Sequence, residues 1–154
     1  MLVDTIQHKG RPAQILLVED NPGDVLLTKK AFQQSKITNQ ILVAKNGEEA
    51  LDMLHRRGAH ANAALPDLIL LDLNLPKKPG QEVLREIKSS EALKHIPVVI
   101  LTSSRAELDV VKTYGLHANS YIIKPVNLEK FTEIVSAIER YWFTIVVLPD
   151  ENNP

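Results

Sequence analysis

Residues 67–76 read DLILLDLNLP, in which four consecutive aliphatic residues, Leu68–Leu71, run straight into Asp72. A short, continuous apolar run of this kind is typical of a strand that is buried on both faces of a sheet. Pro76 and Pro79-Gly80 follow and indicate a loop. We therefore predict a central strand that carries an acid at its carboxyl end.

Four more short apolar runs have the same character, and segments with helical spacing lie between and after them. Strand alternating with helix in this way predicts a doubly wound α/β fold, with a five-stranded parallel sheet covered by helices on both faces. The predicted buried strands are residues 15–18, 41–44, 68–71, 98–101 and 121–123. The predicted helices include Val25, Leu26 and Phe32, then residues 50–54, 83–87, 108–114 and 128–142.

The composition indicates an ordinary globular protein. Of the 154 residues 44% are hydrophobic and 24% are charged, and the formal net charge of −1 gives no basic field for nucleic acid. The chain has no cysteine, which excludes disulfides and thiolate chemistry. Without a signal sequence or a membrane span, we expect a cytoplasmic protein with one folded domain at 14–142, an N-terminal extension at 1–13 and an apolar tail at 143–154.

Polar residues follow four of the predicted strands. In open α/β sheets, ligands bind beyond the carboxyl ends of the strands, so we expect these residues to share one edge. Three carboxylates placed together require a cation, and oxygen ligands favour Mg²⁺. The residues at the four strand ends are Glu19-Asp20, Asp72, Thr102 and Lys124.

This set of residues suits phosphoryl chemistry. Asp72 is the candidate nucleophile, which would form an aspartyl phosphate. Lys124 would supply a mobile ammonium as counter-ion, and the Thr102 hydroxyl would bond a phosphoryl oxygen. The predicted metal ligands are Glu19, Asp20, Asp72 and the main-chain carbonyl of Asn74.

Short motifs surround these residues in a fixed order along the chain. They are LLVEDN at 16–21, DLILLDLNLP at 67–76, Gly80, LTS at 101–103 and YIIKP at 121–125. Over about residues 14–141 the chain resembles the receiver domains of two-component response regulators. The resemblance implies a flavodoxin-like, CheY-like (βα)5 fold. It also implies a signalling protein that receives a phosphoryl group from a sensor histidine kinase and catalyses only its own phosphorylation and dephosphorylation.

Two features point to a particular group of receivers and to a residue of the switch. The turn Asp20-Asn21-Pro22-Gly23-Asp24 and the apolar tail are similar to those of small regulators paired with bacterial and cyanobacterial phytochromes, which implies a phytochrome as the kinase. Tyr121 resembles the aromatic residue that rotates in the family. We expect it to turn inward when Thr102 moves towards a bound phosphoryl group.

The C-terminal tail is unusually apolar for a chain end, and apolar patches of this kind often mark interfaces. We expect a homodimer formed near the fourth and fifth helices with help from the tail. The alternative is a tail that folds back on its own domain. The residues of the expected interface are Tyr141, Trp142, Phe143, Ile145 and Val147.

Three other functions compete with the phosphorylated regulator. A phosphatase of the haloacid dehalogenase type would need a second acid where this chain has Asn74. A binding module that is independent of phosphorylation would not need the full set of site residues. A chemotaxis-type diffusible regulator remains open.

Overall fold

The computed structural model describes residues 12–36, 38–103, 105, 106, 109, 120–124 and 127–142, apart from four side chains within β5 and α6. Those side chains belong to Ser120, Glu139, Tyr141 and Trp142. Apart from residue 109, the predicted helix at 108–114 lies outside the described residues, and so does the tail at 143–154. No helix in the described part is long and apolar enough to cross a membrane.

The sheet has five parallel strands in the order β2-β1-β3-β4-β5. The strands are β1 Ala13–Val18, β2 Asn39–Ala44, β3 Leu68–Asp72, β4 Val98–Thr102 and β5 Ser120–Ile123. The helices are α2 Pro22–Gln33, α3 Gly47–Leu54, α4 Gly80–Ser89 and α6 Leu128–Trp142, with a short 3-10 helix, η1, at Gly58–His60.

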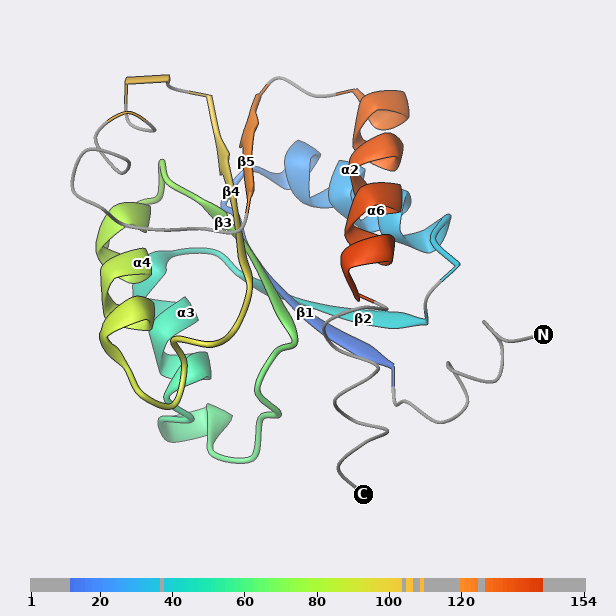
Figure 1. The fold of residues 1–154 in the computed structure, drawn as a ribbon. Helices are drawn as coiled ribbons and strands as arrows, with labels where there is room; N and C mark the ends of the chain where they lie inside the picture. The colour runs from blue at the N-terminus through green and yellow to red at the C-terminus, as the bar shows by residue number, and fades with distance from the viewer. Residues whose placement is uncertain are drawn as a thin grey trace.

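Helices cover both faces of this sheet. Figure 1 shows α2 and α6 together on one face and α3 and α4 on the other. The predicted doubly wound parallel sheet is therefore confirmed. The strand order reverses between β1 and β3, which places the switch point beside the carboxyl end of the central strand.

Asparagine side chains begin the two helices that follow the first two strands. The Asn21 Oδ1 accepts a hydrogen bond from the backbone N–H of Asp24 at 3.0 Å, and Pro22 occupies the first helical position of α2. The Asn46 Oδ1 accepts from the N–H of Glu49 at 2.8 Å at the start of α3. These caps fix where each helix leaves the edge of the sheet.

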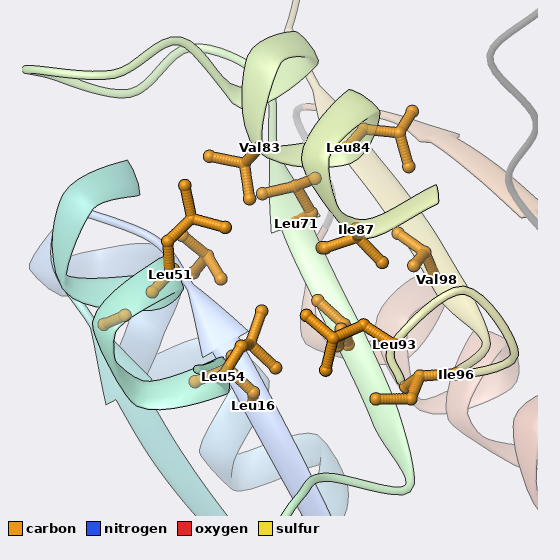
Figure 2. Close-up of a cluster of buried hydrophobic side chains, with 14 of the residues drawn as sticks. Leu16, Leu51, Leu54, Leu71, Val83, Leu84, Ile87, Leu93, Ile96 and Val98 are labelled. Atoms are coloured by element: carbon orange, nitrogen blue, oxygen red, sulfur yellow. The ribbon is translucent and has the colours of Figure 1, made fainter. Parts of the chain in front are cut away.

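The core between the sheet and the α3/α4 layer is built from aliphatic side chains of both. Figure 2 shows Leu16 and Leu71 from the strands meeting Leu51, Leu84 and Ile87 from the helices. A second cluster, which includes Leu17, Leu70 and Phe131, fills the space under α2 and α6. Successive residues of β1 and β3 therefore enter opposite cores, which is why these strands are apolar throughout.

Two aliphatic residues, one in a strand that was predicted to be buried and one in a predicted helix, are exposed. Leu42 is 45% exposed because β2 is an edge strand, so the prediction of a fully buried strand at 41–44 was wrong. Leu26 is 55% exposed because α2 turns Thr28, Ala31 and Phe32 towards the sheet and Leu26 away from it.

This contrast gives a matched test of the core. Leu84 is fully buried, so Leu84→Ala leaves a cavity and should lower the free energy of unfolding by about 2–5 kcal/mol. Leu26→Ala, also on a helix, should change it by less than about 0.5 kcal/mol. Urea denaturation of the two variants measures both values, and equal losses would contradict the described packing.

Candidate functional site

The polar residues at the strand ends meet at one edge of the sheet, as their positions in the sequence predicted. Glu19 directly follows β1, Asp72 ends β3 and Lys124 directly follows β5. Two places earlier in each strand, Leu17 and Leu70 belong to the core under α2 and α6, and Ile122 packs against that core. By strand alternation the three polar residues lean to that same side, towards the start of α2.

The Lys124 ammonium is the centre of this site. Its Nζ lies 2.6 Å from Glu19 Oε1, 2.8 Å from Asp24 Oδ2 and 3.3 Å from Asp72 Oδ2. The Glu19 side chain is 1% exposed and that of Asp72 is 6% exposed. Ion pairs as buried as these are far less screened by solvent than surface pairs.

The site opens to solvent on the side of Asp20. A hollow of about 580 Å³ lies above the ion pairs. Carboxylate oxygens of Glu19, Asp20 and Asp72 lie within 4.8 Å of one another, close enough to share one cation. The hollow is lined by Glu19, Asp20, Asn21, Pro22, Asp24, Asp72, Asn74, Ser103 and Lys124.

The charges in the site do not balance, because four of these lining residues are acids and one is a cation. Burial raises the pKa of Glu19 to about 7, against the lowering effect of Lys124 and with a further increase from Asp72. Burial also lowers the pKa of Lys124, but the hydrogen bonds to Asp24 and Glu19 and the charge of Asp72 outweigh it and raise this pKa above its usual value. Lys124 is therefore firmly charged, and the excess of carboxylates suits a hard divalent cation.

Backbone contacts hold Asp72 in place. Its Oδ1 accepts a hydrogen bond from the N–H of Asn74 at 3.0 Å. Gly80, the first residue of α4, donates its N–H to the carbonyl oxygen of Leu73 at 3.0 Å. A Cβ on Gly80 would lie 2.4 Å from the carbonyl oxygen of Asp72, so only glycine lets α4 start this close to the site.

Thr102 and Tyr121 lie on the other side of the sheet from Lys124. Thr102 is fully buried at the end of β4, and its carbonyl oxygen accepts a hydrogen bond from the N–H of Lys124 at 2.8 Å. Tyr121 is partly buried and packs against the core under α3 and α4. It pairs with Ile100, so it lies one strand across and two residues below Thr102 on the same face.

Comparison with known proteins identifies the family. The model of the response regulator receiver domain matches residues 15–136. The chain belongs to this receiver family. It is therefore a signalling protein, and the resemblance found in its motifs is confirmed.

Individual receivers match over most of their length. The chain is 45% identical over 138 residues to response regulator Rcp1 of Synechocystis, covering 90% of this chain and 94% of the relative. The structure of phosphorylated RcpA, a cyanobacterial phytochrome response regulator, matches with a TM-score of 0.78 and 47% identity over 86% of this chain and 95% of RcpA. The structure of the Mn²⁺-bound form of Rcp1 matches with a TM-score of 0.77 and 44% identity, over 88% of this chain and 97% of Rcp1.

Sequence reasoning missed one residue of this receiver site. Asp24 had been noted only as part of a turn, yet its carboxylate is one of three that hold Lys124. A signal was available in the sequence, because Asp24 lies in the first turn of a helix that begins directly after the Glu19-Asp20 pair. Of the expected interface residues, Tyr141 and Trp142 end α6 and the others lie outside the described residues.

The close approach of Gly80 to Asp72 gives a test of how the receiver positions its acid. Gly80→Ala should lower the free energy of unfolding by about 1–3 kcal/mol, because the new methyl group meets backbone that cannot move aside. Gly23→Ala is the control, since its Cβ would meet the Asn21 side chain at 3.2 Å and should change stability by less than about 1 kcal/mol. Thermal unfolding measures both, and a neutral Gly80→Ala would contradict the geometry.

Proposed function

We propose that this receiver accepts a phosphoryl group on Asp72 from the phosphohistidine of a sensor kinase, and that it signals through a change of shape. The observation that carries the proposal is the contact of Asp72 with the Lys124 ammonium beside a cluster of carboxylates. A carboxylate that is nearly buried, but faces a hollow through which a donor can approach, suits nucleophilic attack on phosphorus.

In the transfer step, one Asp72 carboxylate oxygen forms a bond to phosphorus while the bond from phosphorus to the donor's imidazole nitrogen breaks. The electron pair of the broken bond stays on the imidazole. Lys124 compensates the negative charge on the phosphoryl oxygens, and its high pKa keeps it protonated throughout. The Thr102 hydroxyl is the proposed partner of one phosphoryl oxygen after transfer. In the proposed dephosphorylation, also catalysed by the receiver itself, a water oxygen forms a bond to phosphorus while the bond from phosphorus to the Asp72 oxygen breaks, which restores the carboxylate and releases inorganic phosphate.

Mg²⁺ is the proposed cofactor. The donor set of Glu19, Asp20, Asp72 and the Asn74 main-chain carbonyl is made of oxygen, which both Mg²⁺ and the Mn²⁺ bound in the Rcp1 structure accept. When bound, the cation would neutralise charge on the carboxylates and on the phosphoryl oxygens.

A kinase of the phytochrome type is the proposed partner, and the cytoplasm is the proposed location. Support comes from RcpA, a cyanobacterial phytochrome response regulator, at 47% identity. The similarity to RcpA and to Rcp1 extends over almost the full length of each relative. We propose no nucleic-acid or membrane partner.

Thr102 and Tyr121 form the proposed switch. Both lie on the face covered by α3 and α4, so a movement of Thr102 towards a phosphoryl group would open space on the face where Tyr121 packs. Rotation of Tyr121 into that space would change the surface along β5. A homodimer built on this surface and on the apolar tail at 143–154 is the proposed output.

Phosphorylation is tested directly by mass. With Mg²⁺ and acetyl phosphate, the wild type should gain the mass of one phosphoryl group. Asp72→Asn should gain none, because a side-chain amide does not attack phosphorus as a carboxylate does. Chelating Mg²⁺ with EDTA should abolish the gain. Intact-mass spectrometry measures each reaction.

Asp52→Asn is the matched control for this experiment. Asp52 lies on α3, is 48% exposed and pairs with Arg57 away from the site, so this variant should be phosphorylated like the wild type. A wild type that gains no mass with any donor would point to a binding module that is independent of phosphorylation.

The proposed dimer has its own test. Light scattering coupled to size-exclusion chromatography should show a larger fraction of dimer for the phosphorylated protein than for the unphosphorylated protein. Removal of residues 143–154 should lower the association constant of the dimer at least about tenfold, since apolar contact area is lost. A truncated protein that dimerises equally well would contradict a role of the tail in the dimer and would favour a tail that folds back on its own domain.

A further inference from the structure

The Lys124 ammonium has three N–H groups, and each is directed to a different carboxylate. A phosphoryl oxygen can therefore receive a hydrogen bond from Lys124 only if one of the three carboxylates gives one up. We propose that this carboxylate is Asp24, and that Asp24 is a positioning residue that holds Lys124 before phosphorylation and slows the transfer. The inference rests on the proposed function of Asp72 as phosphoacceptor.

Exposure decides which of the three contacts is exchanged. The Asp24 side chain is 36% exposed, whereas those of Glu19 and Asp72 are nearly buried. A carboxylate that loses its ammonium partner must find water instead, and a buried carboxylate cannot do so without a large cost. Asp24 already lines the open hollow, so water can reach its carboxylate directly.

The backbone around Asp24 keeps its carboxylate within reach of the ammonium. The N–H of Asp24 donates to the Asn21 cap at 3.0 Å, and its carbonyl oxygen accepts from the Thr28 hydroxyl at 2.8 Å. Asp24 thus occupies a fixed place in the first turn of α2. Its position is not that of a freely moving surface acid.

Lys124 has little freedom to turn elsewhere. On its inner side lies a cavity of only about 10 Å³, lined in part by Leu27, Leu101 and Phe131. This space is about that of one water molecule, and among the described residues that line it there is no charged partner beyond the carboxylates already named. The ammonium can therefore exchange Asp24 only for a group that enters the outer hollow, which is where a phosphoryl group on Asp72 would lie.

A contact made before transfer and lost during it stabilises the ground state more than the transition state. Breaking the Asp24 contact therefore adds to the barrier for phosphorylation. After transfer Lys124 already binds the phosphoryl oxygens, and it keeps them in the transition state for hydrolysis. Asp24 should accordingly affect the rate of phosphorylation and leave the rate of dephosphorylation unchanged.

The test measures both rates by intact mass with acetyl phosphate and Mg²⁺. Asp24→Asn should be phosphorylated about threefold faster than the wild type, while its dephosphorylation rate stays the same. Asp24→Glu, which keeps the charge, should be closer to the wild type than Asp24→Asn is. Asp52→Asn removes an equal charge on α3 and should change neither rate.

A double-mutant cycle separates positioning from a general effect of charge. If Asp24 acts through Lys124, Asp24→Asn should give no acceleration in a Lys124→Met background. An equal acceleration in that background, or none in the wild-type background, would overturn the inference. Affinity for beryllofluoride, a phosphoryl mimic, gives a second measure and should rise about threefold in Asp24→Asn.

The same experiment separates the role proposed for Asp24 from the proposed phosphorylation of Asp72. A wild type that is phosphorylated, together with an Asp24→Asn variant of identical rate, would overturn the role of Asp24 and leave the proposed function standing. A wild type that takes no phosphoryl group would overturn both.

Discussion

One buried ammonium holds this site together. Lys124 joins residues that are far apart in the sequence, Glu19 after β1, Asp24 in α2 and Asp72 at the end of β3. Without the ammonium, the carboxylates of Glu19 and Asp72 would lie almost unhydrated and would repel one another. With it, acids outnumber cations among the lining residues. That remaining imbalance is what makes the site suited to a divalent cation and to an anionic group that arrives with it.

The rest of the fold serves to bring these charges to one place. The central strands β1, β3 and β4 are buried on both faces, so their carboxyl ends are fixed relative to one another by two hydrophobic cores. The first turns of α2 and α4 then close around the edge of the sheet. Gly80 allows α4 to begin against the backbone of Asp72, and Asn21 fixes the start of α2 beside Lys124. The first depends on the absence of a side chain, and the second depends on a side-chain oxygen that can accept a hydrogen bond.

The sequence predicted the sheet and most of the site because strands end where apolar runs end. Asp72 and Lys124 could be placed at the edge from their positions after such runs. Leu42 could not be placed, because whether a strand lies at the edge of a sheet depends on strand order and not on its own residues. Asp24 was missed for a related reason, since its contact with Lys124 depends on the angle at which α2 leaves the sheet. Helix spacing also failed to separate Leu26 from its buried neighbours.

The most direct test of the account is to locate the phosphoryl group chemically. The receiver is phosphorylated with Mg²⁺ and a small donor, and the acyl phosphate is then reduced with borohydride, which converts a phosphorylated aspartate to homoserine. Peptide mass spectrometry reads the position. Homoserine at Asp72 and at no other acid is the expected result. Homoserine at Asp20 or Asp24 would contradict it, because the nucleophile would then be one of the residues assigned to hold the cation or the lysine.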